Sequence, residues 1–246
     1  MIAQPVTDAL LGARHVVVLT GSGISAESGI PTFREAQTGL WAQFRPEELA
    51  TPEAFAAAPA RVWEWYAWRR TLVQAAAPNA GHIALARLET LVPRFTLVTQ
   101  NVDGLHARAG SRTVLELHGN ILRTVCSNDR HMVDSWPDPL DPPPRCPECN
   151  AFLRPDVIWF GETLPARELG AAMDAAARCD VFIAVGTSGL VYPAAGLPAL
   201  ALDAGATVLV VNPDATPLTS HPAVHHLRGT AASVLPALVE VLAAAR

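Results

Sequence analysis

Short apolar runs alternate with amphipathic stretches along the 246-residue chain. Six short, mostly apolar runs predict buried strands, and they are Val16–Leu19, Phe95–Thr99, Val114–Leu117, Val157–Phe160, Val181–Val185 and Val208–Val211. Stretches with helical spacing of apolar residues predict the helices Thr7–Gly12, Ala60–Ala77, Gly81–Leu91, Ala166–Ala177, Pro193–Ala204 and Ala231–Ala245. Strands that alternate with helices predict an α/β fold in which helices cover both faces of a parallel sheet.

Two stretches depart from this alternation and predict a smaller lobe. Thr51-Pro52-Glu53 combines an N-cap residue, a first-turn proline and an early acid, so a short helix begins there and ends at Pro59. Residues 122–156 lose periodicity, gain proline and contain three of the four cysteines. We therefore expect one domain over residues 1–246, divided into two lobes. The large lobe comprises about 7–35, 81–121 and 157–246, and the small lobe comprises a helical insertion at about 36–80 and a cysteine module at about 122–156.

The stretch after the first predicted strand is rich in glycine. Gly21-x-Gly23-x-x-Ala26 fits the dinucleotide fingerprint with alanine in place of the third glycine, and Ile24–Glu27 predicts the first turn of a helix. Glycine lets backbone N–H groups approach a phosphate, and a helix N-terminus adds partial positive charge. The same pattern also fits an ordinary glycine-rich turn. As a fingerprint, it favours a Rossmann-like sheet that binds a dinucleotide.

The segment after this fingerprint bears on the fate of the dinucleotide. Gly29-Ile30-Pro31 stops the helix almost at once, because glycine is costly in a helix and proline lacks the N–H donor. The chain then continues as a loop that carries Phe33 and Arg34 over the bound cofactor. A loop over the reactive end indicates a cofactor that is cut, not merely oxidised or reduced.

Polar residues and glycines gather immediately after the predicted strands. The carboxyl ends of parallel strands meet at one edge of a sheet, where ligands bind. The clusters at these ends are Gly21-Ser22-Gly23, Gln100-Asn101-Val102-Asp103, His118-Gly119, Gly186-Thr187-Ser188 and Asn212. Random polar loops are the alternative, but five clusters at one edge predict a single ligand site.

Composition excludes several classes of protein. A formal net charge of −5 argues against nucleic-acid binding, and all 18 basic residues are arginine, so no lysine side chain can be acylated. Four cysteines are too few for a disulfide scaffold at this length. Asp8 and Arg14 interrupt any signal-peptide core, and no apolar run approaches membrane-spanning length. We expect a soluble, cytoplasmic monomer that binds neither nucleic acid nor membrane.

The motifs at the strand ends resemble those of the sirtuins, which are NAD-dependent protein-lysine deacylases. The resemblance runs from about Val16 to Pro236 and rests on GSGISAESGIPTFR (21–34), TQNVDGLH (99–106), LHG (117–119), FGE (160–162), GTS (186–188) and VNPD (211–214). Two residues depart from the usual pattern. Ser22 stands where the family usually has alanine, and Thr32 stands where many members have aspartate. Thr32 within PTFR resembles the class III, desuccinylase-like branch.

The resemblance implies a reaction in which the acyl oxygen of a modified lysine attacks the nicotinamide ribose as nicotinamide leaves. His118 would then act as general base on a ribose hydroxyl, because an imidazole has an unperturbed pKa of about 6.5. Asn101 and Asp103 would complete the catalytic set by holding the ribose and a water. From the residues alone, His118 also fits a hydrogen-bonded histidine at a strand end.

The resemblance also implies an NAD site that draws on several loops. Gln100 would bind ribose hydroxyls, Arg34 the pyrophosphate or ribose, and Asn212 the adenosine ribose. The full implied set is Gly21, Ser22, Gly23, Ile24, Ala26, Glu27, Thr32, Phe33, Arg34, Gln100, Asn101, Val102, Asp103, Gly186, Thr187, Ser188, Asn212, Pro213, Asp214 and Ala231.

A Tyr-x-x-Arg pair bears on the acyl group. Tyr66 and Arg69 share a helix face, where a phenol and a guanidinium make a fork for a carboxylate. In class III sirtuins such a pair marks succinyl, malonyl or glutaryl groups, whereas the alternative is a core tyrosine beside a solvated arginine. The acyl-lysine peptide would lie extended between two segments, Val157–Glu162 and Gly189–Val191. Within the first segment, Val157, Phe160, Gly161 and Glu162 would contact the substrate. Plain deacetylation, NAD hydrolysis and ADP-ribosyl transfer are the alternative reactions.

The cysteine module implies a structural zinc site, because sirtuins usually hold zinc with two Cys-x-x-Cys pairs. Cys146 and Cys149 form one pair, but the other is reduced to Cys126. Asp129 or His131 would supply the fourth ligand, since both residue types bind zinc. The alternative is a knuckle that has lost its metal and is held by packing.

Overall fold

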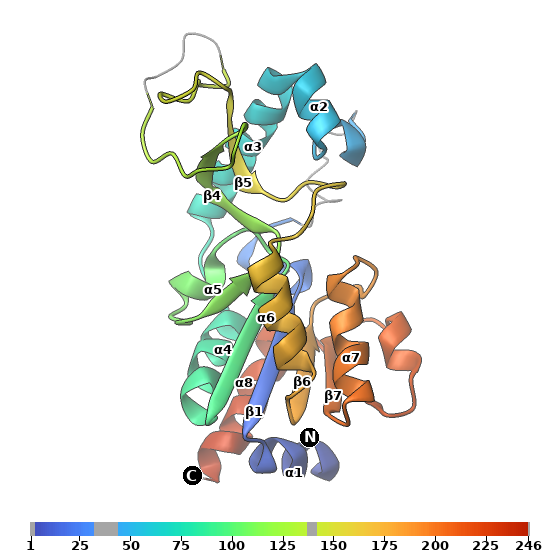
Figure 1. Cartoon of the computed structure of the whole chain (residues 1–246). Coiled ribbons are helices and arrows are strands. Elements are labelled where there is room, and N and C mark those ends of the chain that lie inside the picture. Colours follow the sequence, from blue (N-terminus) through green and yellow to red (C-terminus); the bar gives the residue numbers. More distant parts are fainter. Residues whose placement is uncertain (1–2, 32–43, 137–141, 246) are drawn as a thin grey trace.

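A six-stranded, all-parallel sheet forms the centre of the large lobe (Figure 1). In sheet order the strands are β3 (Val114–Glu116), β2 (Arg94–Thr99), β1 (His15–Thr20), β6 (Val181–Val185), β7 (Thr207–Asn212) and β8 (Val224–Arg228). The computed structural model describes residues 3–31, 44–136 and 142–245. The strand order reverses direction between β1 and β6, and ligands bind at such a reversal in open parallel sheets.

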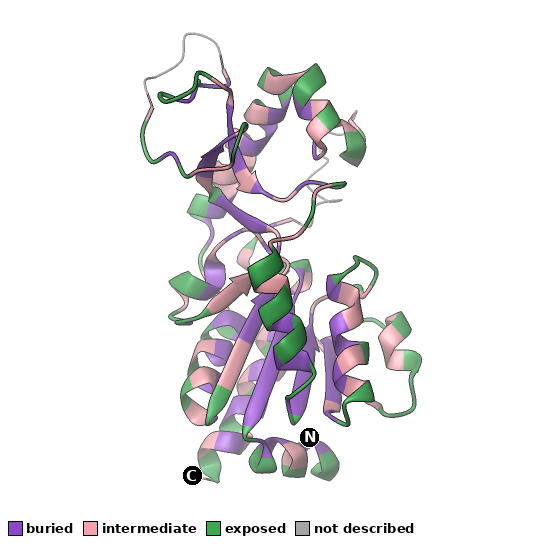
Figure 2. Cartoon of the chain, viewed as in Figure 1, coloured by how far each residue is buried: buried purple, intermediate pink, exposed green. Residues whose placement is uncertain are grey.

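Helices cover both faces of this sheet, as the alternation of strands and helices predicts. Along β1, Val16 and Val18 pack into one apolar layer, whereas Val17 and Leu19 pack into the other, and all four are fully buried. The first layer includes α1 (Gln4–Gly12), α4 (Ala80–Leu91) and α8 (Ala231–Ala244), and the second includes α6 (Ala166–Ala176) and α7 (Leu197–Asp203). Figure 2 shows the buried strands between these layers and the exposed outer surface of α6.

The small lobe combines two helices with an antiparallel pair of strands (Figure 1). They are α2 (Pro52–Ala57), α3 (Pro59–Ala75), β4 (Gly119–Cys126) and β5 (Leu153–Val157). Thr51 caps α2 as predicted, because its Oγ1 accepts a hydrogen bond of 3.1 Å from Ala54 N. A separate apolar core holds this lobe together, and it includes the fully buried Trp65 and the nearly fully buried Tyr66 and Trp159.

Two predicted elements are wrong. The apolar run Val157–Phe160 is not a strand of the parallel sheet, because β5 ends at Val157 and pairs only with β4. Val157 and Trp159 are buried in the small-lobe core instead, which explains the apolar pattern. Ile24–Glu27 does not begin an α-helix. Two short 3-10 helices, η1 (Ser22–Ile24) and η2 (Ala26–Ser28), stand in its place, and the second is capped by Gly29, whose φ is 78°.

Several short elements complete the described residues. They are η4 (Pro46–Glu48), α5 (Leu105–Arg108), η5 (Ala194–Gly196) and η6 (Pro217–Ser220). The sequence pattern does not predict α5, β4 or the edge strand β8, whose Val-His-His-Leu-Arg sequence lacks an apolar run. No helix in the described part of the chain is both long and apolar enough to cross a membrane.

Candidate active site between the two lobes

A cavity of about 560 Å³ lies where the carboxyl ends of β1, β2 and β6 face α3 and the segment after β5. This volume suits a small-molecule site. The predicted site residues that line it are Gly21, Ser22, Tyr66, Arg69, Gln100, Asn101, Val102, Asp103, His118, Val157, Phe160, Gly161, Glu162, Gly186, Thr187 and Ser188. The structure therefore brings most of the predicted strand-end clusters to one place.

The remaining predicted residues lie elsewhere. Gly23, Ile24, Ala26, Glu27, Asn212, Pro213, Asp214 and Ala231 do not line the cavity. Asn212 Nδ2 donates a 3.1 Å hydrogen bond to the carbonyl of Thr187, which does line it. Glu27 accepts a 3.2 Å hydrogen bond from Ala232 N at the start of α8. Thr32, Phe33 and Arg34 lie outside the described residues, so their roles stay predictions.

Three glycines, of which Gly21 and Gly186 line the cavity, allow two loops to touch. A Cβ on Gly21 would lie 2.8 Å from the carbonyl oxygen of Gly186, and one on Gly23 would lie 2.7 Å from Gly186 Cα. Gly23 N donates a 2.8 Å hydrogen bond to that same carbonyl. Gly186 itself has a φ of 57°, which favours glycine. These residues thus leave a floor of bare backbone, which a dinucleotide can approach closely.

His118 is held in one protonation pattern. Its Nδ1 lies 2.8 Å from the carbonyl oxygen of Gln100, and a carbonyl only accepts, so Nδ1 carries the proton and donates. In the neutral ring, Nε2 is then the basic atom. Burial lowers the pKa of His118, and the hydrogen bond to Gln100 opposes that shift. The imidazole is therefore neutral at physiological pH and able to accept a proton.

Asn101 and Asp103 meet through Ser25, a residue that the sequence analysis did not single out. Asn101 Nδ2 donates to Ser25 Oγ at 3.1 Å and to the Gly21 carbonyl at 3.0 Å. Ser25 Oγ donates to Asp103 Oδ2 at 2.7 Å, and Leu105 N donates to Oδ1 at 2.9 Å. Burial raises the pKa of Asp103, and these hydrogen bonds and the charge of Arg69 oppose the shift. Both side chains are thus fixed at the cavity wall.

Two buried histidines support this group from behind. His82 Nδ1 accepts from Asn79 N, so its Nε2 carries the proton and faces Ser25 Oγ at 3.5 Å. His106 Nε2 lies 2.8 Å from Thr20 Oγ1, and the two imidazole rings are 4.9 Å apart. Burial lowers the pKa of His82 to about 4, and burial together with the His82 charge lowers that of His106 to about 3. Both rings are therefore neutral in the folded protein at neutral pH.

Tyr66 and Arg69 lie together on α3 in the wall of the cavity, and Arg69 is close enough to Asp103 for their charges to attract. The Arg69 guanidinium carbon is 4.9 Å from the ring centroid of Trp65 and 5.9 Å from that of Tyr66. Burial lowers the pKa of Arg69, opposed by its attraction to Tyr66 and Asp103. Burial raises the pKa of Tyr66 to about 12, so its phenol stays protonated and can donate a hydrogen bond. The pair presents a cation and a donor to the cavity.

Glu162 lines the cavity with its carboxylate already engaged. Arg154 donates to both of its oxygens, at 2.6 and 2.8 Å, and Trp159 N donates to Oε2 at 2.7 Å. These bonds lower the pKa of Glu162 against the effect of burial. The side chain therefore orders the segment after β5, and the substrate contact predicted for Glu162 stays a prediction. Arg154 and Trp159 were not predicted, since their role depends on contacts distant in sequence.

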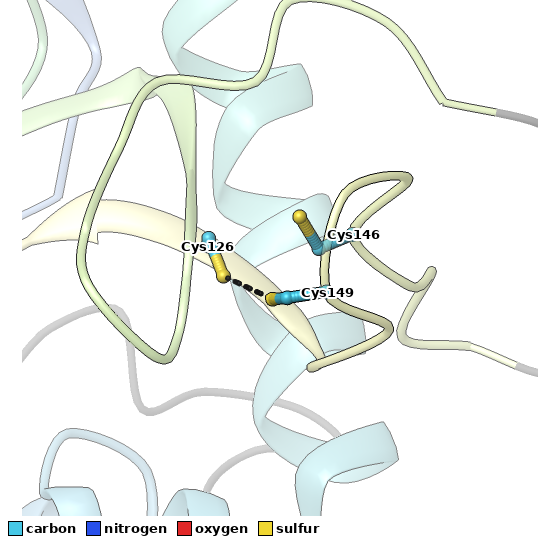
Figure 3. Close-up of side chains that lie close together, drawn as sticks. All are labelled: Cys126, Cys146 and Cys149. Atoms are coloured by element: carbon cyan, nitrogen blue, oxygen red, sulfur yellow. Dashed lines mark hydrogen bonds between the residues drawn. The ribbon is translucent and has the colours of Figure 1, made fainter.

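Three thiols gather in the cysteine module, as Figure 3 shows. The potential ligand atoms of Cys126, Cys146 and Cys149 all lie within 4.8 Å of one another, with 3.4 Å between the sulfurs of Cys126 and Cys149. His131 Nε2 lies 3.5 Å from Cys146 Sγ, and its Nδ1 lies 2.6 Å from Asp129 Oδ1. Tetrahedral zinc, with bonds of about 2.3 Å to sulfur and about 2.0 Å to nitrogen, needs similar separations. The three thiols fit zinc, and Asp129 and His131 form a second close group with Cys126, so the identity of the fourth ligand stays a prediction.

Similarity to known proteins extends over nearly the whole chain. The Sir2 family model matches residues 21–193. NAD-dependent protein deacylase 1 of Pseudomonas aeruginosa is 51% identical over 244 residues, which cover 96% of this chain and 97% of that protein. A crystal structure of a Sir2 homologue–NAD complex has a TM-score of 0.91 and 45% identity, covering 100% of this chain and 95% of that one. A Sir2–p53 peptide–NAD+ complex has a TM-score of 0.83 and 30% identity, covering 98% of each chain.

Proposed function

The chain belongs to the Sir2 family of NAD-dependent protein deacylases, and on that premise we propose that it removes negatively charged acyl groups from protein lysines. Succinyl, malonyl and glutaryl groups share the terminal carboxylate that this reaction requires. Acyl-lysine, NAD and one water react to give nicotinamide, the O-acyl-ADP-ribose and the free lysine. One observation carries the proposal, namely the buried Tyr66 phenol beside the half-buried Arg69 guanidinium in the wall of the cavity.

The pairing favours an anionic acyl group over a neutral one for an electrostatic reason. Burial has already lowered the pKa of Arg69, which means that the protein surroundings disfavour its charge. An acyl carboxylate would offset that cost by a charge-assisted hydrogen bond, and the Tyr66 proton would supply a second bond. An acetyl group offers neither, so deacetylation is the slower reaction in this proposal.

His118 supplies the base for the step that follows release of nicotinamide. In the neutral tautomer set by Gln100, its Nε2 accepts the proton of a ribose hydroxyl, which can then attack the acyl carbon. Its lowered pKa keeps it ready to do so at neutral pH. NAD is the second substrate of the reaction and brings the glycosidic bond that is broken.

Asn101, Asp103 and Ser25 hold the nicotinamide-ribose end of NAD in this proposal. Their mutual hydrogen bonds of 2.7 and 3.1 Å fix the amide and the carboxylate before the substrate arrives. Such prior fixation lowers the cost of orienting the reacting groups. Gln100, whose Nε2 donates to Thr187 Oγ1 at 3.0 Å, lies at the floor between β2 and β6 and would bind ribose hydroxyls.

The peptide that carries the modified lysine would enter between two exposed segments. Phe160 is 54% exposed on one side, and Leu190 and Tyr192 are 59% and 76% exposed on the other. An extended peptide can pair its main chain with such segments, which makes sequence preference weak. The cytoplasmic location and the monomeric state stay predictions.

We also propose that zinc is held by Cys126, Cys146, Cys149 and the Nε2 of His131. The Asp129 carboxylate faces His131 Nδ1, so it orients the ring instead of serving as a ligand. Four protein ligands leave no open position, and the metal therefore stabilises the module and takes no part in the chemistry.

Matched peptides that differ only in the acyl group test the proposed function. The enzyme is incubated with NAD and a succinyl-, acetyl- or unmodified-lysine peptide, and kcat/KM and product masses are measured. O-succinyl-ADP-ribose formed with a higher kcat/KM than O-acetyl-ADP-ribose supports the proposal. A higher kcat/KM for the acetyl peptide, or free ADP-ribose without any change in the peptide, would contradict it.

A further inference from the structure

The indole of Trp159 makes a directional contact with Tyr66 across the small-lobe core. Trp159 is 3% exposed, and its Nε1 donates a 3.0 Å hydrogen bond to Tyr66 Oη. An indole nitrogen can only donate, so the phenol oxygen must accept in this bond. The proton of the phenol then points away from the indole. Tyr66 lines the cavity, so a ligand bound there is the acceptor that this proton would meet in the proposed arrangement.

Three groups fix the plane of this indole. The guanidinium carbon of Arg154 lies 3.3 Å from the ring centroid of Trp159, and Arg154 is itself held by both carboxylate oxygens of Glu162. The ring centroid of Phe55 lies 5.2 Å from that of Trp159. Backbone N–H of Trp159 donates to Glu162 at 2.7 Å, which fixes the main chain as well. The indole N–H therefore has one direction in which to donate.

We propose that Trp159 is a positioning residue for acyl-group selection. Its indole N–H turns the hydroxyl proton of Tyr66 toward the acyl carboxylate. Without the indole donor, the phenol can rotate its proton toward other acceptors, and the carboxylate loses a defined partner. The inference rests on the proposed function, since it assumes that the acyl group ends in a carboxylate. Selectivity between acyl groups then depends on Trp159, and on Arg154 and Glu162, which hold its indole. It does not depend only on the α3 residues that would contact the substrate.

The test is Trp159→Phe, which keeps an aromatic ring beneath Arg154 but removes the N–H donor. The readout is the ratio of kcat/KM for succinyl-lysine peptide to kcat/KM for acetyl-lysine peptide. We expect this ratio to fall about tenfold, mainly through KM for the succinyl peptide, as for partial loss of one charge-assisted hydrogen bond. Phe152→Leu is the matched control, because Phe152 packs in the same lobe core, 6.2 Å from the ring centroid of Phe55, and is not one of the groups that fix the indole. It should change both kcat/KM values in proportion.

A double-mutant cycle with Tyr66→Phe separates positioning from packing. If Trp159 acts through the phenol, adding Trp159→Phe to Tyr66→Phe causes no further fall in the succinyl-to-acetyl ratio. Additive effects of the two changes would overturn the inference, as would a wild-type ratio in Trp159→Phe. A wild-type enzyme without succinyl preference would instead overturn the proposed function, and the inference with it.

A spectroscopic measurement tests the hydrogen bond without any substrate. Trp159→Phe removes one of the six indole cross-peaks in the ¹H–¹⁵N spectrum and so assigns it. In Tyr66→Phe we expect that cross-peak to shift and its hydrogen to exchange faster with solvent. An indole resonance and exchange rate that Tyr66→Phe leaves unchanged would overturn the inference.

Discussion

Replacing Arg69 with methionine tests the charge in the acyl pocket most sharply. Methionine keeps a long apolar side chain against Trp65 and Tyr66 but removes the guanidinium, which lies 4.9 and 5.9 Å from their ring centroids. A hydrogen bond to a charged group contributes about 1.5–3 kcal/mol. Because Arg69 is only half-buried, solvent screens part of that interaction, and we expect a loss of about 2 kcal/mol. This corresponds to about a 30-fold fall in kcat/KM for succinyl-lysine peptide.

The assay compares succinyl- and acetyl-lysine peptides at saturating NAD. Removal of the Arg69 charge also removes the desolvation cost that lowers its pKa, so we expect kcat/KM for the acetyl peptide to stay or rise. Arg61→Met on the same helix is the matched control, since Arg61 is exposed and does not line the cavity. An equal fall for both peptides, or no change for either, would refute the electrostatic reasoning.

Three further predictions concern the base, the buried histidines and the metal. His118→Ala should lower kcat for O-acyl-ADP-ribose formation by about 10²–10⁴-fold, because His118 acts after nicotinamide has left. Because the pKa of His118 is lowered, wild-type kcat/KM should persist at pH 6.5 and fall only at lower pH. In the folded state the pKa values of His82 and His106 are about 4 and about 3, so just below pH 6.5 these two residues bind protons only in the unfolded chain. The free energy of unfolding, measured by urea titration, should therefore fall by about 1.4 kcal/mol per pH unit and histidine down to about pH 4. His131→Ala should lower the zinc content measured by atomic absorption, whereas Asp129→Ala should weaken zinc binding by only about 10–100-fold. Equal zinc content in the wild-type protein and both variants would contradict the ligand assignment.

The strand ends could be predicted from sequence because parallel strands carry them to one edge. Gln100, Asn101 and His118 each follow an apolar run. The parallel register of β1 with β2 and β6 then brings the ends of these strands close together. Helix caps such as Thr51 also depend on local sequence, so the residue type is enough to predict where the helix begins. The α/β fold follows from the same patterns, since the order of strands and helices fixes it.

Contacts between distant residues could not be predicted in the same way. Trp159 and Tyr66 are 93 residues apart in sequence, and the apolar run around Trp159 reads as a strand of the wrong sheet. Arg154 lies in a polar stretch that contains a proline, so the sequence pattern does not predict the strand β5 there. The bonds of Ser25 to Asn101 and Asp103 likewise depend on how two loops meet. Local patterns contain no information on these approaches.

A crystal structure with an NAD analogue and a succinyl-lysine peptide tests the proposed function most directly. The succinyl carboxylate should lie within hydrogen-bond distance of both Tyr66 Oη and the Arg69 guanidinium, with His118 Nε2 beside the nicotinamide ribose. A succinyl carboxylate that points into solvent, away from Tyr66 and Arg69, would contradict the proposed function.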